Sequence, residues 1–365
     1  MPYYGDRGRL NPYRAWPMRA VVLTGQGEVE VQDVSEPQLE GPRDAVVKVT
    51  LAGICGSDMH LYHLRTPGAE AGITLGHEFV GVVEEVGAQV TRVRQGDRVV
   101  GSFFTSCRSC WYCRRGWYCQ CERRRIFGHG PFLGDLNGAQ AERLLVPDAD
   151  GTLEPVPSEV NDEDAIWVAD QLSTGMFCVD RAEIKPGDTV GVVGCGPVGL
   201  AAIMCARAVG AGNIYAVDFV DHRLRQAERL GAIAIDANQS HPVEFVRERT
   251  DDRGVDVSLE CVGAKRAVDT AIEWTRPAGT VSMVGVTDVV EYPLAAATAW
   301  LKDLTLRTGI ANVPRYMGPL LQLIAAGRLS PASLISHRMP LDQAPGAYRM
   351  YDAHDCLKIV LTPSP

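Results

Sequence analysis

Two patterns of hydrophobic and polar positions follow each other along the chain. Up to about residue 165, short apolar runs such as Ala45–Gly53 and Phe79–Gly87 are interrupted by Gly, Pro and Asp. Runs of this length between turn-forming residues are typical of short strands. The part of the chain from Met18 to about Ala165 is therefore predicted to be an irregular β-rich domain.

From about Asp188, apolar runs of strand length alternate with helical segments. The predicted strands are Thr189–Val193, Ile214–Val217, Val255–Leu259, Val281–Val284 and Leu304–Ile310. The predicted helices between them are Gly199–Val209, Arg223–Leu230 and Arg266–Trp274. This alternation predicts a doubly wound parallel sheet. After about Pro319 the pattern is mixed again, with a last strand predicted at Leu357–Leu361.

Length and composition restrict the class of protein. At 365 residues the chain is longer than one hydrophobic core usually supports, which favours two domains. No apolar stretch approaches the roughly 20 residues that span a bilayer, so we expect no membrane partner. The net charge of −9 argues against a nucleic-acid partner, because phosphate binding requires a basic face. Eleven cysteines without an apolar N-terminal segment favour a reducing, cytoplasmic location.

Four cysteines in one short segment form the most specific motif. Cys107, Cys110, Cys113 and Cys121 follow the spacing C-x2-C-x2-C-x7-C. Four thiolates from one loop suit a tetrahedral ion, and this spacing favours zinc. The alternatives are disulfides, which need an oxidising compartment, and an iron–sulfur site, which usually ends in x3 and Cys-Pro. A closed site of four cysteines has no open position for a substrate, so we interpret it as structural.

A glycine-rich turn follows the predicted strand Thr189–Val193. The sequence GCGPVG at residues 194–199 matches G-x-G-x-x-G between a strand and a helix. Gly194 would permit the tight turn, Gly196 the approach of a pyrophosphate, and Gly199 the close packing of the helix on the strand. The N–H groups at the start of the helix would then face the phosphates. The motif in this setting predicts dinucleotide binding.

Asp218, at the end of the next predicted strand, bears on which nicotinamide cofactor is used. A carboxylate at this position accepts hydrogen bonds from the adenosine ribose and would repel the 2′-phosphate of NADP, so we expect NAD. Arg223 could lie along the same ribose or be an ordinary exposed helix residue. The other residues predicted to contact the cofactor are Pro197, Val198, Val262, Val284 and Gly285.

Two further motifs lie in the β-rich part, and each is unspecific by itself. They are CGSDMH at residues 55–60 and GHE at residues 76–78. With them the chain resembles the zinc-dependent medium-chain alcohol dehydrogenase family from about Met18 to its C-terminus. The resemblance rests on these two motifs, GDRV at residues 96–99, the four-cysteine segment, STG at residues 173–175, and the glycine-rich turn with Asp218.

The resemblance implies a catalytic zinc site and a path for protons. It makes Cys55 and His77 two ligands of the catalytic zinc, with Glu78 as the acidic residue behind the metal. Ser57 would receive the proton of the substrate alcohol, and His60 would pass that proton to solvent.

The third zinc ligand departs from the commonest pattern of the family. Many members carry a Cys three residues before the S-T-G motif, whereas this chain has Asp170 there. Carboxylate is an accepted zinc ligand, so we expect Asp170 to bind the metal directly. The alternative is that Asp170 only caps a helix that begins near Ser173.

The resemblance also implies an architecture and an assembly. The expected fold is α/β, with an irregular β-rich GroES-like catalytic domain and a doubly wound parallel-sheet Rossmann domain. The expected divisions are an N-terminal extension at residues 1–17, the catalytic domain with its zinc lobe at 18–170, the NAD-binding domain at 171–315, and a return to the catalytic domain at 316–365. The strand Leu304–Ile310 would be an open sheet edge, which favours a homodimer or a tetramer made of two dimers.

The expected activity is hydride transfer between NAD(H) and a small primary or secondary alcohol or the corresponding carbonyl compound. We expect two zinc ions per chain, one catalytic and one structural. The alternatives are a glutathione-independent formaldehyde dehydrogenase or dismutase, a polyol dehydrogenase, a zinc-free reductase of the same superfamily, and a non-catalytic zinc- and NAD-binding protein. The candidates for an apolar substrate wall are Phe103, Phe127, Trp167 and Trp300.

Overall fold

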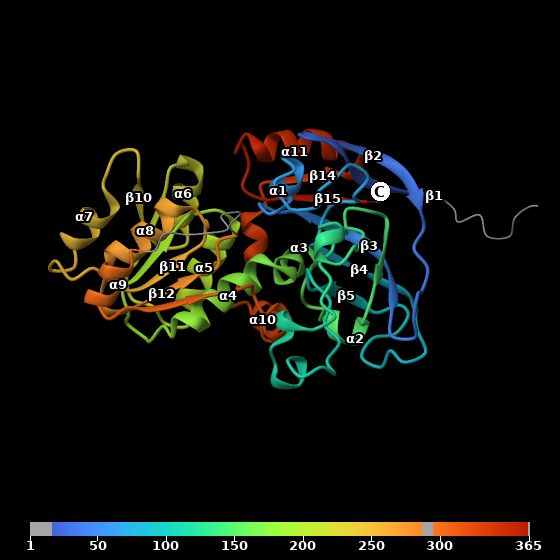
Figure 1. Ribbon diagram of the computed structural model, residues 1–365, viewed down its shortest axis with the longest axis horizontal. Coiled ribbons are helices and arrows are strands. Elements are labelled where there is room, and N and C mark those ends of the chain that lie inside the picture. The colour runs from blue at the N-terminus through green and yellow to red at the C-terminus, as the bar shows by residue number, and fades with distance from the viewer. Residues whose placement is uncertain (1–16, 287–294, 364–365) are drawn as a thin grey trace, which may run out of the picture.

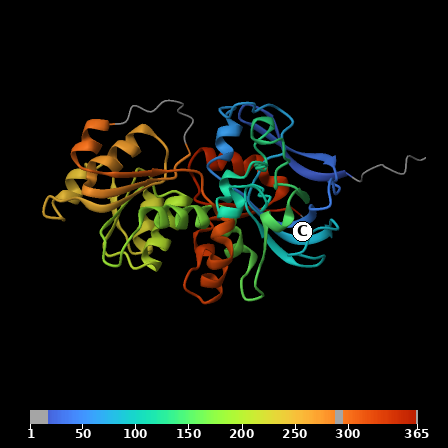
Figure 2. The ribbon, with the colours of Figure 1, turned by 60° about the horizontal axis from the view of Figure 1, so that its bottom comes forward.

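The computed structural model describes residues 17–286 and 295–363. These residues form two lobes that lie side by side, as both ribbon views show (Figures 1 and 2). We call them the parallel-sheet lobe and the β-rich lobe after the sheet that each contains. Residues 1–16 of the expected N-terminal extension lie outside the described residues, and Pro17 is the first residue of the first strand.

The parallel-sheet lobe is built on six parallel strands. They are β8 Val190–Val193, β9 Ile214–Asp218, β10 Ile233–Asp236, β11 Val255–Glu260, β12 Thr275–Met283 and β13 Thr305–Thr308. Their order across the sheet is β10-β9-β8-β11-β12-β13. The chain therefore reverses direction across the sheet between β8 and β11, which is the switch point where doubly wound sheets bind ligands. The predicted strand at Leu304–Ile310 is confirmed as β13, at the end of the sheet.

Helices cover both faces of this sheet. Their bounds are α4 Gln171–Ala182, α5 Pro197–Ala208, α6 Asp221–Arg229, α7 Pro242–Arg247, α8 Lys265–Trp274 and α9 Ala296–Leu301. On β8, Val190 and Val192 pack with α4 and α5 in one core, whereas Val193 packs with α7 and α8 in another. Alternate residues of the strand thus serve opposite faces of the sheet.

A close crossing joins α4 to α5. A Cβ on Gly175 would come within 2.7 Å of the Ala202 backbone nitrogen, so only glycine allows this approach. Helix α4 thereby packs directly on the helix that begins at the glycine-rich turn.

The β-rich lobe contains a seven-stranded sheet and a separate hairpin. The sheet runs β14-β15-β3-β4-β5-β7, with β6 also paired to β3. Its strands are β3 Ala45–Ile54, β4 Phe79–Val86, β5 Arg98–Gly101, β6 Arg143–Val146, β7 Leu153–Pro155, β14 His337–Pro340 and β15 Ile359–Thr362. The hairpin joins β1 Pro17–Gly25 to β2 Glu28–Ser35.

The C-terminal segment returns to this sheet. Strand β15 pairs antiparallel with β3, and β14 pairs parallel with β15, so the C-terminal segment completes the sheet of the β-rich lobe (Figure 1). The remaining helices are α1 Asp58–Tyr62, α2 Ala149–Thr152, α3 Asp162–Ala165, α10 Met317–Ala325 and α11 Ala344–Asp352. No helix in the described ranges is long and apolar enough to cross a bilayer.

Candidate active site and metal centres

Four potential metal ligands meet where the end of β3 and the start of β4 lie close to the start of α4. Cys55 follows β3, His77 and Glu78 precede β4, and Asp170 precedes α4. One ligand atom from each lies within 4.8 Å of the others, and all four residues are buried. The fold therefore brings together residues that are more than one hundred positions apart in the sequence.

The predicted proton path begins at this cluster. The Ser57 hydroxyl oxygen lies 3.2 Å from His77 Nε2. His60 lies one turn further along, on α1, and is partly buried. Ser57 therefore contacts the cluster, and the partly buried His60 follows it on α1.

The electrostatics of the cluster fit a bound cation. The Cys55 sulfur is 3.4 Å from Asp170 Oδ2, and His77 Nε2 is 3.5 Å from the same oxygen. Burial raises the pKa of the Cys55 thiol, and the carboxylates of Asp170 and Glu78 raise it further. A divalent cation among these atoms would favour the thiolate and neutralise the carboxylate. Sulfur, nitrogen and oxygen donors in this number are the set that catalytic zinc uses.

Asp170 occupies the position of a helix cap without acting as one. It is the residue immediately before α4, but its side chain accepts no hydrogen bond from the backbone of the first turn. Its Oδ1 instead accepts a hydrogen bond of 2.8 Å from the Thr174 hydroxyl, while Oδ2 faces Cys55 and His77. Although burial acts in the opposite direction, the hydrogen bond from His77 lowers the pKa of Asp170. The carboxylate therefore faces the cluster as an anion.

Asp58 is a residue of the site that sequence reasoning did not assign, although it lies inside the CGSDMH motif. It is fully buried, its Oδ1 lies 3.0 Å from His77 Nδ1, and its Oδ2 accepts the Cys55 N–H at 2.9 Å. The two atoms of this contact with His77 are not aligned for a good hydrogen bond, so the interaction between the two side chains is chiefly electrostatic. Burial opposes protonation, yet Asp58 and Asp170 raise the pKa of His77 well above its usual range. A carboxylate on the far nitrogen is the usual support of a metal-binding histidine.

Lys358 was also missed, and it is the only lysine among the buried residues of the described chain. Its ammonium forms an ion pair with Glu78 and donates to Ile54 O at 3.2 Å and Gln171 Oε1 at 3.2 Å. Gln171 in turn donates to Glu78 and lies 3.4 Å from Asp170 Oδ2. A lysine inside the apolar run of the last predicted strand, Leu357–Leu361, was the signal in the sequence that could have indicated it. This network ties Glu78 to the residue before Cys55 and to the start of α4.

The second cluster lies in a loop of the β-rich lobe and consists of Cys107, Cys110, Cys113 and Cys121. Their sulfurs meet within 4.8 Å, with Cys107 and Cys113 at 4.0 Å. Backbone N–H groups point at these sulfurs, from Cys110 to Cys107 at 3.3 Å and from Cys107 to Cys121 at 3.3 Å. Burial acts in the opposite direction, but hydrogen bonds from Ser109 lower the pKa of Cys107 to about 6. These contacts stabilise thiolates and so fit a tetrahedral zinc site.

A fifth cysteine, Cys119, lies in the same segment of the sequence. It is buried and stands apart from the four-cysteine cluster. Its backbone N–H donates to Asn312 Oδ1 at 3.1 Å, and the Asn312 amide donates to Gly116 O at 2.6 Å. One side chain thus fastens the four-cysteine loop to the segment that follows β13.

The glycine-rich turn has the geometry that its motif requires. Gly194 has φ 91°, a left-handed conformation that favours glycine. A Cβ on Gly199 would lie 1.8 Å from Gly194 O, so the helix can approach the strand only with glycine there. A Cβ on Gly196 would meet nothing within 4 Å, which leaves open space in front of the backbone. Helix α5 begins at Pro197, whose fixed φ suits the first helical position.

Asp218 ends β9 beside this turn and is tied to backbone donors. Its Oδ2 accepts the Cys195 N–H at 2.7 Å, and its Oδ1 accepts the N–H groups of Phe219 and Val220 at 2.7 and 2.9 Å. Arg223 lies on α6, with Nη2 3.4 Å from His354 Nδ1. The sequence indicated the carboxylate but not that it also organises the turn.

The other predicted cofactor residues lie at the carboxyl ends of β11 and β12. Glu260, which was not predicted, accepts the N–H groups of Val262 and Gly263, both at 2.8 Å. Val284 follows β12 and donates its N–H to Glu260 O. A Cβ on Gly285 would lie 2.0 Å from the Gly263 nitrogen, so the two loops interlock. Val262 remains 45% exposed and its side chain borders Gly194.

Two of the aromatic residues expected to form a substrate wall lie in the core instead. Trp167 and Phe127 are fully buried, whereas Trp300 is 80% exposed on α9. Phe103 alone stands at the site, with its ring centroid 6.1 Å from that of His77. The sequence could not distinguish aromatic residues of the core from those of a substrate pocket, because both are large and apolar.

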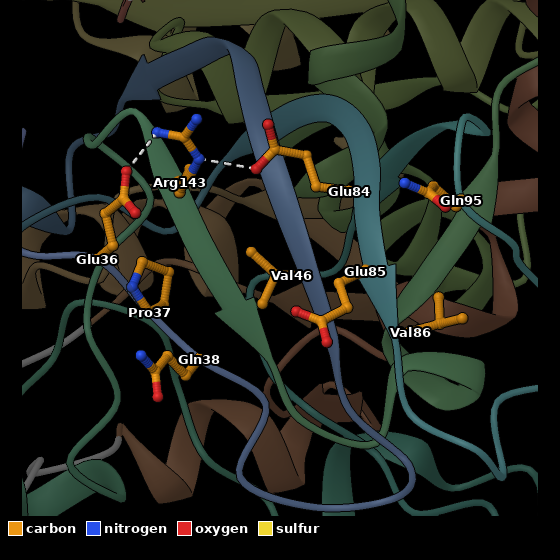
Figure 3. A pocket seen from close by; sticks show the side chains of 9 residues that line it. All are labelled: Glu36, Pro37, Gln38, Val46, Glu84, Glu85, Val86, Gln95 and Arg143. Atoms are coloured by element: carbon orange, nitrogen blue, oxygen red, sulfur yellow. Dashed lines mark hydrogen bonds and ion pairs between the residues drawn. The ribbon is translucent and has the colours of Figure 1, made fainter. Parts of the chain in front are cut away.

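A hollow of about 600 Å³ on the β-rich lobe lies away from both cysteine clusters (Figure 3). Its one cation, Arg143, is held between Glu36 at 2.9 Å and Glu84 at 2.7 Å. Because that charge is already paired, the hollow offers no anion site, and the chemistry of the chain is to be sought at the buried cluster.

Comparison with known proteins agrees with this geometry. Residues 41–158 match the alcohol dehydrogenase GroES-like domain, and residues 197–326 match the zinc-binding dehydrogenase domain. A probable zinc-binding alcohol dehydrogenase of Mycobacterium tuberculosis is 40% identical over 332 residues, which cover 91% of this chain and 84% of that protein.

Two solved structures extend the likeness to three dimensions. The alcohol dehydrogenase TADH of Thermus sp. ATN1 has a TM-score of 0.91 and 46% identity over 94% of this chain and 99% of that one. A putative zinc-binding dehydrogenase of Sinorhizobium meliloti, solved with NADP, has a TM-score of 0.84 and 30% identity over 95% of this chain and 100% of that one.

The chain therefore belongs to the zinc-dependent medium-chain dehydrogenase family. It is a zinc-type, alcohol- or polyol-dehydrogenase-like oxidoreductase of α/β fold, with a GroES-like part and a Rossmann-like parallel sheet. Members of this family act on small molecules, in keeping with the predicted small-molecule substrate.

Proposed function

We propose that this protein is an NAD-dependent zinc alcohol dehydrogenase that interconverts small primary or secondary alcohols and their carbonyl products. The observation that carries the proposal is the convergence of Cys55, His77 and Asp170 in one buried cluster, with Ser57 in contact with His77. A purely structural cluster would need no hydroxyl directed at it, whereas alcohol oxidation needs a group that takes the proton of the alcohol.

In this proposal Cys55, His77 and Asp170 are the three ligands of a catalytic zinc. One thiolate and one carboxylate balance the charge of the ion, as two thiolates do in the commoner pattern. Glu78, held by Lys358 and Gln171, stays behind the metal and supplies negative charge rather than a fourth ligand. The position facing Ser57 is left for the substrate.

When bound, zinc supplies a Lewis acid that lowers the pKa of an alcohol oxygen and polarises a carbonyl group. Ser57 accepts the proton of the alcohol, and His60 passes it outward to solvent. The carboxylate of Asp58, 3.0 Å from His77 Nδ1, supplies negative charge beside the His77 ring. In the direction of reduction the same two residues return the proton to the oxygen.

The cofactor is proposed to bind along the carboxyl ends of β8, β9, β11 and β12. Gly194, Gly196 and Gly199, with Pro197 and Val198, would receive the pyrophosphate at the start of α5. Val262, Val284 and Gly285 would flank the nicotinamide. Asp218 and Arg223 would contact the adenosine ribose, and the carboxylate supports NAD, although one relative was solved with NADP.

The second zinc of the proposal is structural and is held by Cys107, Cys110, Cys113 and Cys121. The domain divisions near residues 170 and 315 are part of the same proposal. The open edge of β13 supports a homodimer or a dimer of dimers, because pairing two such edges would close both. Light scattering at micromolar concentration should give a mass above that of one chain.

A panel of alcohols tests the proposed activity. Protein stripped of adventitious metal and reloaded with zinc should reduce NAD in the presence of primary or secondary alcohols, and the metal-free protein should not. Preferential dismutation of formaldehyde would favour the formaldehyde dehydrogenase alternative. No turnover of any alcohol or aldehyde with either cofactor would refute the proposed function.

A further inference from the structure

His129 lies in a loop that the structure fixes beside the catalytic cluster. It stands between Gly128 and Gly130, which have φ angles of 66° and 71°. A Cβ on Gly128 would come within 2.8 Å of the Gly76 nitrogen, so the two backbones are in direct contact. Gly76 is the residue before His77. The sequence Gly-His-Gly therefore sets His129 against the chain that carries a proposed zinc ligand.

The side chain of His129 has one occupied and one free ring nitrogen. Its Nδ1 lies 2.8 Å from Phe127 O. A carbonyl oxygen can only accept a hydrogen bond, so Nδ1 carries the proton and Nε2 presents a lone pair. Within residues 17–286 and 295–363, Nε2 has no hydrogen-bond partner, and it is not among the enclosed polar atoms that lack one. The Nε2 lone pair is thus unused and not fully enclosed.

That acceptor belongs to the surroundings of the proposed metal. The ring centroids of His129 and His77 are 5.1 Å apart with the planes at 66°, an edge-on contact. Phe103 makes a second edge contact with His77, at 6.1 Å and 82°. The proposed ligand is therefore flanked by one apolar ring and one ring with an unused acceptor. Nothing in the proposed transfer of protons and hydride requires that acceptor.

We propose that His129 determines substrate specificity by accepting a hydrogen bond from a second hydroxyl group of the substrate. The inference rests on the proposed function and sharpens it to vicinal diols and polyols. The partner of Nε2 must be a donor, which excludes carboxylate, carbonyl and ether oxygens. A cationic amine would be placed beside the positive charge of the metal. Because the His129 ring packs on the ring of a proposed ligand, the hydroxyl group that it would meet is one close to the reacting carbon rather than one at a distant end of the substrate.

The test compares 2,3-butanediol with 2-butanol, which differ by that single hydroxyl, using NAD and zinc-loaded protein. His129→Phe keeps a flat ring but has no acceptor, and His129→Gln offers an amide oxygen. His337→Phe, at a histidine whose ring bonds Ser336 on the surface, is the matched control. Melting temperature and zinc content are measured for every variant, so that a folding defect is recognised.

We expect His129→Phe to lower kcat/KM for the diol about tenfold to a hundredfold through KM, with 2-butanol changed less than threefold. His129→Gln should retain part of the diol preference, and His337→Phe all of it. An equal loss on both substrates, or a wild-type protein that prefers 2-butanol, would overturn the inference and leave the proposed function intact. Turnover of neither alcohol would overturn the inference, whereas only the failure of the whole panel of alcohols and aldehydes would overturn the proposed function.

Discussion

The two cysteine-containing clusters differ in almost every respect that matters for chemistry. The four-cysteine cluster comes from one short loop, uses sulfur alone and is supported by backbone N–H groups. The catalytic cluster comes from three distant segments, mixes sulfur, nitrogen and oxygen, and is surrounded by Asp58, Glu78 and Lys358.

This difference is the one expected between a structural and a catalytic metal site. In the proposed function, the four cysteines would satisfy all four coordination positions of a zinc ion and would need only dipoles around them. The proposed catalytic site would leave one position free, so charged neighbours would set the basicity of its ligands. Disturbing the two sites should accordingly have different consequences, which the following predictions make measurable.

The largest effect is expected at Asp170, the ligand that departs from the common pattern. Asp170→Asn removes a negative charge from the cluster, so catalytic zinc should bind more weakly and turnover should fall by several orders of magnitude. Thr174→Val, which removes only the hydroxyl donor to the same carboxylate, is the matched control and should cost less than tenfold. Metal analysis and steady-state kinetics measure both. Normal zinc content and near-normal turnover in Asp170→Asn would mean that Asp170 is no ligand.

The loop site should show the opposite profile. Cys113→Ser should lower the zinc content from two ions to one per chain and lower the melting temperature, while the kcat of the surviving folded protein changes only a few-fold. Structural zinc in isolated peptides contributes about 10–16 kcal/mol. We expect less here, because each lobe also has a hydrophobic cluster of its own. Loss of all zinc, or of turnover without loss of stability, would contradict the division of roles.

Lys358 tests the charged support of the catalytic cluster. Lys358→Met leaves Glu78 buried without its cation, so the free energy of unfolding should fall by about 3–5 kcal/mol. Lys358→Arg should lower the free energy of unfolding by less. The double variant with Glu78→Gln should recover part of the loss, because no buried charge is then left without a partner. Denaturant unfolding of the wild type, the single variants Lys358→Met and Glu78→Gln, and the double variant measures the coupling. Additive losses in the double variant would show that the two side chains act independently.

The smallest effect is expected at the cofactor. Asp218→Ala removes the repulsion of the 2′-phosphate, so the preference for NAD over NADP should narrow by roughly one order of magnitude. It also deprives three backbone N–H groups of their acceptor, so a modest loss of stability should accompany the change. Ratios of kcat/KM for the two cofactors measure the effect. A wild-type preference for NADP would invalidate the interpretation of Asp218.

Much of the parallel sheet could be predicted because its strands are short, apolar and regularly spaced. The predicted helix Arg266–Trp274 and the observed α8 differ by one residue. Strand β10 and helix α11 were missed for physical reasons. Ile233 and Ala234 are not fully buried on β10, and α11 contains Pro345 and Gly346, which disfavour a helix until Tyr348 is buried against β15 and β1.

Sequence patterns likewise revealed only those parts of the sites that depend on local spacing. The four-cysteine cluster is local, so its spacing alone revealed it. Ser57, His77 and Asp170 were found only through a family resemblance, since nothing local states that they meet. Lys358 and His129 were missed because their importance comes from neighbours distant in the sequence, Glu78 in one case and His77 in the other.

The close crossing at Gly175 has a mechanical consequence. Asp170 stands at the start of α4, and α4 is locked on α5, whose first turn borders the open space at Gly196. Cys55 and His77 belong to the other lobe. If the two lobes swivel against each other, Asp170 travels with the phosphate-facing helix while the other two donors stay behind. A metal ion bound by all three residues would then link the two lobes, and the strain on its bonds would change when a dinucleotide binds.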